Sequence, residues 1–447
     1  MIRLTPKRLK ILKTFNFYLC FIALGMLMAI PGPTLLDLQH LVGTDTKSIA
    51  FIFTARSIGY LTGALAGGVV FDYTKSKLAL LTGGSILATI ATFCVPWSTS
   101  LKMLIGLMVL IGLSLGALDT GCNVYFLNMW GDERRSLYLA LHFMFGVGGL
   151  IGPLIAAPFL GNYSSIADDP AHHTNRSEVE VSSPSYFYSS STDLTLDEIV
   201  TNVNSIYSII GGISLLASII FITVTLLSRS QTINFQETSK EQFQKRSCVF
   251  MCVIISLFSL LIFVETGTEI GYPQMLTSFA VKGKLQLSPA TGSYMTSAFW
   301  AAFTVGRLVS IFLAIKLSSF TLLITDIAIA SAGALVFLIF SDQEWALWVT
   351  SILLGFGISS FYPSAVSWLN KYINVTNKII SLFVLGYSAG DMTIPFTISR
   401  FIDDVPEVLS YVVVTSCISI AILASILFII LRKEKLKNKI VENIALQ

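Results

Sequence analysis

Residues 248–280 read CVFMCVIISLFSLLIFVETGTEIGYPQMLTSFA. This apolar stretch is long enough to cross a hydrocarbon core of ~30 Å, which takes about 20 residues in a helix. It nevertheless carries two acids, Glu265 and Glu269. A carboxylate at bilayer depth costs a few kcal/mol, so it usually faces a protein interior or an aqueous cavity where a cation or a polar solute meets it. The stretch therefore predicts a membrane helix with a functional acidic face, and solute movement is the first hypothesis.

The composition of the whole chain extends this prediction. Of its 447 residues, 54% are hydrophobic and only 12% are charged, whereas soluble domains carry roughly a quarter charged residues. The hydropathy pattern predicts an all-α polytopic membrane protein with about twelve spanning helices. The first six lie near residues 14–36, 48–70, 78–97, 101–127, 136–160 and 203–228, and the second six near 248–280, 289–315, 320–340, 344–369, 377–401 and 407–431.

The order of these segments divides the chain near its middle. Residues 1–228 form a predicted N-terminal bundle of six helices, which includes a long Ser-rich and acidic loop at about 161–202. A hydrophilic linker at 229–247 leads to a second bundle of six helices at 248–431, followed by a tail at 432–447. Two bundles of equal helix number predict a substrate cavity between them, as in transporters built from parallel repeats.

Basic residues predict the orientation in the membrane. With the N-terminus inside, the cytoplasmic segments hold 21 of the 29 Lys and Arg residues, which fits the retention of positive charge in the cytoplasm. Both termini are then cytoplasmic, and the plasma membrane is the expected location. The loop at 161–202 falls outside, where its sequons at Asn162 and Asn175 are available for glycosylation. The six cysteines all lie in predicted helices, so no disulfide framework and no metal site are expected.

One short motif resembles a known family. Residues 68–77 read GVVFDYTKSK, which is similar to the loop that follows the second helix in the major facilitator superfamily. Gly68, Asp72 and Lys77 match that pattern, whereas Tyr73 and Lys75 depart from it. The resemblance implies a hinge or charge contact at Asp72 and Lys77, and a simple solvated turn is the alternative.

Longer runs resemble one branch of that superfamily. FIFTARSIGYL at 51–61, ALHFMFG at 140–146 and FWAAFTVGRL at 299–308 are similar to the sodium-dependent glucose transporter 1 group, also called major facilitator superfamily domain-containing protein 4. The resemblance covers both halves and implies a sugar transporter with the two-bundle fold. It also implies Na⁺ as the coupling ion, although carboxylate oxygens suit hard cations generally and do not separate Na⁺ from H⁺.

The group is related to fucose and glucose–galactose symporters, which carry an acid and an amide in the fourth helix. Residues 119–125 read DTGCNVY and keep both, so the resemblance implies that Asp119 is a coupling carboxylate. Asp119 and Asn123 also share one helix face because they are four residues apart. The relatives carry an acid in the first helix that is missing here at 30–34, which puts proton coupling through an acid pair in the first half in doubt.

The seventh helix supplies two more candidates for cation coupling. Glu265 and Glu269 are four residues apart, so like charges on one face raise the cost of ionising both. A bound cation or a shared proton would relieve that cost. Gly267-Thr268-Glu269 also resembles a Gly-Ala-Glu of the relatives, which favours Glu269. The structural alternative is a hydrated vestibule near the outer mouth.

Four charged residues inside other spans need partners. Asp391 lies near the middle of the eleventh span and is predicted to contact substrate or ion, with a structural hydrogen bond as the alternative. Arg307 and Asp326 lie at similar distances from the turn between the eighth and ninth spans, which favours a structural salt bridge. Arg56 has no partner on its own hairpin, and we expect it to meet Glu269 or another acid across the cavity when the outer side closes.

Recognition of a sugar requires polar groups around the hydroxyls and an aromatic surface for the ring. Asn123, Gln274 and Trp300 are the candidates, and the weaker Tyr294 and Trp368 are equally well explained as interfacial aromatics. His142 is predicted to bind a sugar hydroxyl or relay a proton, or else to be a buried packing residue.

Taken together, these residues predict a secondary active transporter that moves a hexose by cation-coupled alternating access, with Na⁺ preferred over H⁺. A carrier of another small neutral solute such as urea, or a membrane receptor without flux, remains open. An enzyme is not expected, because no nucleophile–base pair or spaced metal cluster is visible. The expected partners are the sugar, the coupling cation and the bilayer; neither another cofactor nor nucleic acid is expected, since the net charge is only +3.

Overall fold

A computed structural model describes residues 5–74, 76–130, 135–161, 202–228, 248–373, 375 and 377–445, and these are helical throughout with no strand. The first half consists of α1 (Pro6–Ala29), α2 (Leu35–Leu41), α3 (Thr46–Ile49), α4 (Phe51–Tyr73), α5 (Lys77–Cys94), α6 (Leu101–Trp130), α7 (Arg135–Ala156) and α8 (Val203–Leu227). The second half consists of α9 (Cys248–Lys282), α10 (Pro289–Leu313), α11 (Ser319–Phe340), α12 (Glu344–Ile358), α13 (Phe361–Leu369), α14 (Asn377–Phe401) and α15 (Val408–Ala445).

The helices have the lengths that a membrane protein needs. Eleven segments of the described chain are long and apolar enough to span a bilayer, and α14 adds a further helix of 25 residues. α14 packs against α9 and α4. The tenth span is built from α12 and α13, which are separated by a break at Ser359 and Ser360. The all-α polytopic fold is therefore confirmed.

Local signals in the sequence explain where several helices begin. Ser288 and Ser318 accept hydrogen bonds from the backbone N–H groups of Thr291 and Thr321, each at 3.1 Å. Such serine caps satisfy a backbone donor that the first turn leaves unpaired. α10 also has Pro289 in its first turn, where a missing N–H costs nothing.

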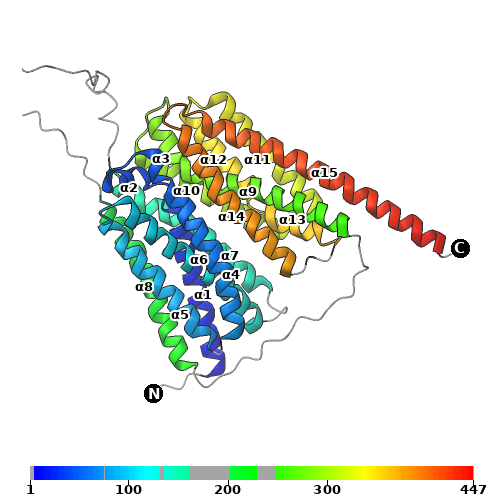
Figure 1. Ribbon diagram of the computed structural model, residues 1–447, viewed down its shortest axis with the longest axis horizontal. Helices are drawn as coiled ribbons and strands as arrows, with labels where there is room; N and C mark the ends of the chain where they lie inside the picture. Colours follow the sequence, from blue (N-terminus) through cyan, green and yellow to red (C-terminus); the bar gives the residue numbers. More distant parts are fainter. Residues whose placement is uncertain are drawn as a thin grey trace, which may run out of the picture.

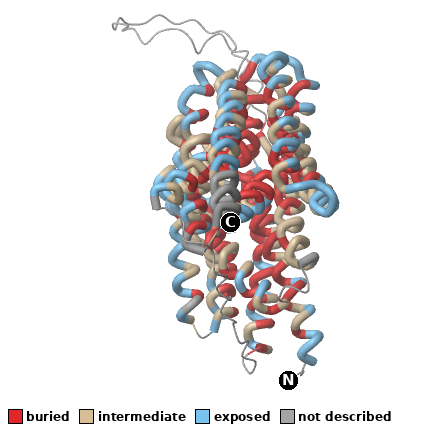
Figure 2. Tube along the Cα trace, turned by 90° about the vertical axis from the view of Figure 1, so that its right-hand side faces the viewer, coloured by how far each residue is buried: buried red, intermediate tan, exposed pale blue. Residues whose placement is uncertain are grey.

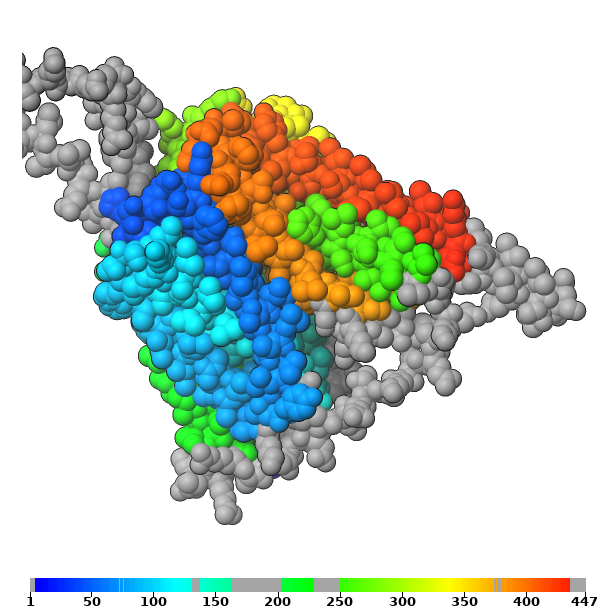
Figure 3. All heavy atoms as spheres, viewed as in Figure 1, coloured from blue at the N-terminus to red at the C-terminus, as the bar shows by residue number. Residues whose placement is uncertain are grey.

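The two halves form separate bundles that diverge from one end. Figure 1 shows the bundles close together near α2 and α3 and splayed apart toward the ends that carry the two termini. In the space-filling view, the blue and cyan first half and the orange and red second half occupy different sides of the molecule (Figure 3). Buried residues concentrate along the middle, and exposed ones on the outward faces of the helices (Figure 2).

Glycines set the closest contact within the first bundle, between α4 and α6. A Cβ on Gly112 would collide with the carbonyl oxygen of Arg56, and one on Gly116 with that of Tyr60. Gly63 meets the carbonyl oxygen of Leu113 in the same way from the α4 side. Small residues let two helix backbones approach closely in a membrane. This contact fixes the part of α4 that carries Arg56 and Tyr60 directly against α6.

Among the described residues, most contacts between the bundles come from α4 with α14 and from α7 with α10, and α3 adds a smaller contact with α14. Several predicted features fall outside this description. The linker at 229–247, most of the loop at 161–202 and both sequons, Asn162 and Asn175, lie outside the described residues. The ends of that loop are close together, because the backbone N–H of Asn202 donates to the carbonyl of Phe159 at 3.2 Å. The predicted tail at 432–447 begins within α15 rather than after it.

Candidate functional site

A cavity of about 230 Å³ lies between the two bundles and takes lining residues from both. The first bundle contributes Phe21, Leu24, Met28, Tyr60, Leu115, Asp119, His142 and Phe145, and the second contributes Glu265, Thr266, Glu269, Arg307, Tyr362, Val384 and Tyr387. The lining combines a largely apolar and aromatic surface with a few polar groups, which is typical of small-molecule sites.

The cavity brings together the three acids that the sequence singles out for cation coupling. Asp119 reaches it from α6, and Glu265 and Glu269 reach it from α9. Arg307 is the lining residue with a permanent positive charge, and His142 is counted as neutral. With every acid ionised, the lining carries a formal charge of −2. Such a surplus in a low-dielectric space attracts a cation.

Asp119 is held by two neutral donors. Tyr60 donates its hydroxyl hydrogen to Oδ2 at 2.7 Å, and Asn123 donates from Nδ2 to Oδ1 at 3.0 Å. The spacing of four residues on α6 places the Asn123 amide beside Asp119, as the sequence predicts, and the amide also donates to the Asp119 carbonyl at 2.9 Å. Asn123 therefore supports the carboxylate and is not among the residues that line the cavity.

Glu265 and Glu269 are both buried and interact with each other. Glu265 accepts from the hydroxyl of Thr266 at 3.3 Å through Oε2, whereas Oε1 has no hydrogen-bond partner among the described residues. A buried carboxylate oxygen without a donor is costly. The pair is therefore ready to take up a cation or a proton.

Arg307 does not form the predicted salt bridge with Asp326. Its Nε donates to the carbonyl of Ser359 at 3.2 Å, and its guanidinium lies 4.3 Å from the ring centre of Phe303. Asp326 instead accepts from the hydroxyl of Ser360 at 2.6 Å. The prediction was wrong because equal distance from a turn fixes depth in the membrane but not the direction in which a side chain leaves its helix.

The residues proposed for sugar recognition are placed differently from the prediction. Trp300 is buried in the α7–α10 contact, with its ring centre 6.2 Å from that of Phe145 and its ring against Gly149. Gln274 lies beside Arg56 with its amide oxygen turned toward the guanidinium, 3.2 Å from Nη1. Neither residue lines the cavity. Close packing of the helices keeps both side chains out of the cavity lining, and their roles in substrate binding stay predictions.

The aromatic surface of the cavity comes from other residues. Tyr60, Tyr362 and Tyr387 line it together with Phe21 and Phe145. The weaker candidates lie elsewhere: Tyr294 is 42% exposed on α10, and Trp368 is buried against Phe320. His142 does line the cavity, where its ring meets the edges of Phe21 and Tyr138.

Asp391 faces the first bundle and pairs with Arg56. The distance from Arg56 Nη2 to Asp391 Oδ1 is 3.1 Å, and Ser57 donates its hydroxyl hydrogen to Oδ2 at 2.5 Å. Arg56 also donates from Nη1 to the carbonyl of Met28 at 3.0 Å. Asp391 is thus the acid that Arg56 meets across the bundles; this pair fits the structural alternative for Asp391, and its contact with substrate or ion stays a prediction. We call Arg56, Ser57 and Asp391 the deep contact.

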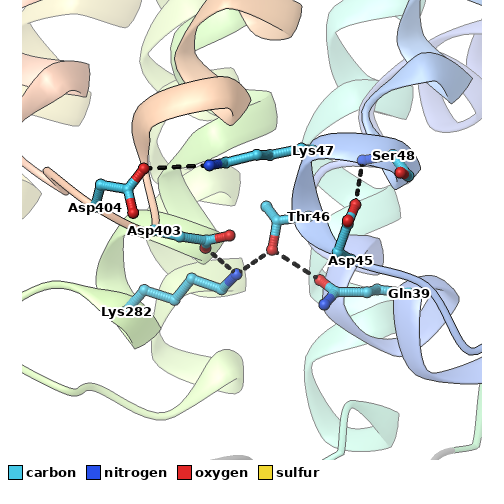
Figure 4. Close-up of polar contacts among 8 residues, drawn as sticks. All are labelled: Gln39, Asp45, Thr46, Lys47, Ser48, Lys282, Asp403 and Asp404. Atoms are coloured by element: carbon cyan, nitrogen blue, oxygen red, sulfur yellow. Dashed lines mark hydrogen bonds and ion pairs between the residues drawn. The ribbon is translucent and has the colours of Figure 1, made fainter.

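A second set of contacts joins the bundles at the surface of the same end, as Figure 4 shows. Lys282 at the end of α9 forms an ion pair with Asp403 at 2.6 Å and donates to the Thr46 hydroxyl at 2.5 Å. Lys47 on α3 pairs with Asp404 at 3.2 Å. We call Lys47–Asp404 and Lys282–Asp403, with Thr46, the surface contacts. Together with the deep contact they close this end, which we call the closed end.

Three charged groups near the closed end have pKa values shifted by their neighbours. Hydrogen bonds from Ser48 lower the pKa of the Asp45 carboxyl at the start of α3. Lys284 pairs with Glu407 at 2.9 Å, which lowers the pKa of Glu407 and raises that of Lys284.

At the opposite end, Lys77 donates to the carbonyl of Phe71 at 2.8 Å. The side chain of Asp72 lies outside the described residues, so the charge contact predicted for it stays a prediction.

Comparison with protein families gives the same architecture. The family described as Major Facilitator Superfamily matches residues 17–395. The chain belongs to this superfamily. It is 31% identical to the human sodium-dependent glucose transporter 1 over 92% of this chain and 77% of that protein. It is 30% identical to the mouse sodium-dependent glucose transporter 1A over 93% and 95% of the two chains, and 25% identical to the major facilitator superfamily domain-containing protein 4A of Xenopus tropicalis over 85% and 84%.

Solved structures of superfamily members share the fold. The crystal structure of a mutant of the nucleoside transporter NupG covers 94% of this chain and 99% of its own, with a TM-score of 0.64 at 11% identity. The relatives are transporters and not enzymes. The resemblance seen in the sequence is therefore confirmed, and the chain is an integral, multi-pass membrane transporter of the superfamily.

Proposed function

We propose that this superfamily member is a secondary active transporter that moves a hexose together with a cation, with Na⁺ preferred over H⁺. The observation that carries the proposal is the cavity between the bundles, in which Asp119, Glu265 and Glu269 face Arg307 amid tyrosine and phenylalanine rings. Aromatic rings suit the apolar face of a sugar, and carboxylates suit both its hydroxyls and a hard cation. The names of the mouse and human relatives support glucose and sodium as the first pair to test.

The shape of the molecule supports alternating access. The bundles are joined by the deep contact and the surface contacts at one end and splay apart at the other. The distribution of Lys and Arg supports a cytoplasmic location for the termini, and hence for the splayed end. On this orientation the structure is the state closed toward the outside, and the opposite state requires the deep contact to separate.

Coupling follows if the cation changes the balance between these states. A cation on Asp119 or on the α9 glutamates removes part of the surplus negative charge and satisfies the oxygen of Glu265 that has no donor. A ligand shifts a conformational equilibrium only by its differential affinity for the two states. We infer that the cation-loaded cavity is the form that accepts the sugar, and that the plasma membrane is the site of action.

The test is uptake of labelled glucose into proteoliposomes that contain the purified protein. The internal solution is held constant while the external solution supplies an inward Na⁺ gradient, an inward H⁺ gradient or neither. We expect accumulation above equilibrium with the Na⁺ gradient alone. Accumulation with the H⁺ gradient alone would support hexose transport but would identify H⁺, not Na⁺, as the coupling ion. Absence of uptake under every gradient, from protein that elutes as a single folded species, would contradict hexose transport and favour another neutral solute such as urea or a receptor without flux.

A further inference from the structure

Two helices from different bundles face each other in a regular way at the cavity. On α4, Arg56 and Tyr60 are four residues apart and share a face, and on α14 the same holds for Tyr387 and Asp391. Arg56 pairs with Asp391 at 3.1 Å, and the rings of Tyr60 and Tyr387 lie 5.9 Å apart at an angle of 34°. The contact between α4 and α14 thus consists of an ionic pair and, one turn away, an aromatic pair that lines the cavity.

Tyr60 makes a second contact that sets it apart from Tyr387. Its hydroxyl donates to Oδ2 of Asp119 at 2.7 Å, whereas the Tyr387 hydroxyl has no recorded hydrogen bond among the described residues. Tyr60 therefore touches both the carboxylate proposed to take the cation and the aromatic pair that faces the other bundle. The close α4–α6 contact at Gly116, next to the Tyr60 carbonyl, holds the backbone of Tyr60 against the helix that carries Asp119.

Cation binding at Asp119 must act on this hydrogen bond. Both donors to the carboxylate, the Tyr60 hydroxyl and the Asn123 amide, are neutral, so neither cancels its charge. A cation or proton on Oδ2 weakens the hydrogen bond from the Tyr60 hydroxyl, because an oxygen that shares electron density with a cation is a poorer acceptor even though it has a second lone pair. Release of the hydroxyl frees the ring to move against Tyr387.

We propose that Tyr60 is the positioning residue that transmits the occupancy of Asp119 to the sugar-facing aromatic pair. The inference rests on the proposed function, since it assigns the residue through which cation and hexose are coupled. Cation binding releases the Tyr60 hydroxyl and lets the Tyr60–Tyr387 pair take the arrangement that holds the sugar ring. Coupling between two sites typically changes affinity by about 5- to 150-fold, and the effect is reciprocal.

The experiment measures equilibrium binding of labelled D-glucose to purified protein in detergent, with saturating Na⁺ and with choline in its place. The quantity compared is the ratio of the two dissociation constants. For the unchanged protein we expect a ratio of at least about fivefold. Tyr60→Phe keeps the ring but removes the hydrogen bond. Its two dissociation constants should therefore differ by no more than about twofold. Tyr18→Phe is the matched control, because it removes a tyrosine hydroxyl of the same bundle that donates to the carbonyl of Leu137 at 3.0 Å and does not line the cavity, and its ratio should stay near that of the unchanged protein.

A second measurement separates coupling from damage to the cation site. The shift of the melting temperature caused by Na⁺ without sugar reports cation binding directly. Tyr60→Phe should keep a Na⁺-induced shift while it loses the cation effect on glucose affinity. A Tyr60→Phe protein that retains the full ratio, or one that loses the Na⁺ shift as well, would overturn the assignment, as would an equal loss of ratio in Tyr18→Phe.

Different results would refute cation coupling of the transporter and the role assigned to Tyr60. If the unchanged protein binds glucose with the same affinity in Na⁺, in choline and at pH 5.5 and 7.5, cation coupling itself is refuted and the assignment of Tyr60 falls with it. If the unchanged protein shows the cation effect and Tyr60→Phe shows it undiminished, the proposed function stands and the assignment alone is refuted.

Discussion

The deep contact and the surface contacts join the same two bundles at the same end, but they differ in their surroundings. In the deep contact the side chains of Arg56 and Asp391 are 1% and 3% exposed, whereas Lys47 and Asp404 at the surface are 41% and 67% exposed. Removal of one partner from a buried pair costs about 3–5 kcal/mol, because the other charge stays buried without compensation. Exposed pairs contribute roughly 0.2–1 kcal/mol each. The stability of the closed end therefore depends mainly on the deep contact.

The largest effect is expected from Asp391→Asn. The substitution leaves Arg56 buried without its counter-charge, so the closed arrangement should lose about 3–5 kcal/mol relative to the opened one. Spin labels at positions 44 and 405, one on each bundle at the closed end, report the separation by electron–electron dipolar spectroscopy. We expect the distance distribution to move toward longer values.

The double substitution Arg56→Met with Asp391→Leu is the control for that experiment. It removes both charges, and replacement of a whole buried pair by apolar residues is often neutral. Its distances should stay closer to those of the unchanged protein than the distances of Asp391→Asn do. A single variant that keeps the short distance would show that the deep contact does not hold the closed end.

A smaller effect is expected from Lys282→Gln. Lys282 is 23% exposed and bridges Asp403 and Thr46 across the bundles, so its loss removes an ion pair and a hydrogen bond of the surface contacts. Its contribution should be about 1 kcal/mol or less and should decrease with salt, because exposed charges are screened. The same spin labels, measured at low and high ionic strength, check this expectation. An effect as large as that of Asp391→Asn would contradict the ranking.

Lys47→Gln should have a smaller effect still, since both partners of that pair are largely exposed. The matched control is Lys284→Gln. Lys284 pairs with Glu407, but both residues belong to the second bundle, so this pair does not join the bundles. The labels should report a slight opening for Lys47→Gln and none for Lys284→Gln. An equal response of the two variants would show that the surface charge as a whole, and not contact across the bundles, controls the closed end.

The Lys284–Glu407 pair also gives the smallest expected effect, a dependence of stability on pH. Its lysine lowers the pKa of Glu407 in the folded protein. A depressed carboxyl pKa contributes stability above the ordinary glutamate range, and this contribution is lost as the pH falls through the folded pKa. The melting temperature of the unchanged protein should therefore exceed that of Glu407→Gln at pH 7, and the difference should shrink as the pH falls below about 4.3. A difference that grows on acidification would contradict the assigned pair.

Much of the fold could be predicted from the sequence because apolar length and charge distribution are one-dimensional signals. The helix-rich two-bundle architecture and the shared faces of Asp119 with Asn123 and Glu265 with Glu269 follow from hydropathy and from a spacing of four residues. What could not be predicted is how each helix is rotated against its neighbours. That rotation decides that Trp300 packs against Gly149 and that Asp326 meets Ser360.

The residues missed in the sequence carry a signal in retrospect. Tyr60 lies in the run FIFTARSIGYL, four residues after Arg56, and so shares its helix face. Tyr387 precedes Asp391 by the same spacing. In each case a charged residue inside a span marks the inward face, and an aromatic residue one turn away lines the cavity. The partner of each was hidden because α4 and α14 are separated by more than 300 positions in the chain.

The most direct test of the account compares the unchanged protein with Asp119→Asn in proteoliposomes. Asparagine keeps the size of the side chain and its acceptor for the Tyr60 hydroxyl but removes the charge that the account assigns to the cation. With an inward Na⁺ gradient, the unchanged protein should accumulate labelled glucose above the external concentration. Asp119→Asn should only equilibrate it, while still exchanging internal for external glucose. Accumulation by Asp119→Asn equal to that of the unchanged protein would contradict the role of the cavity carboxylate in coupling.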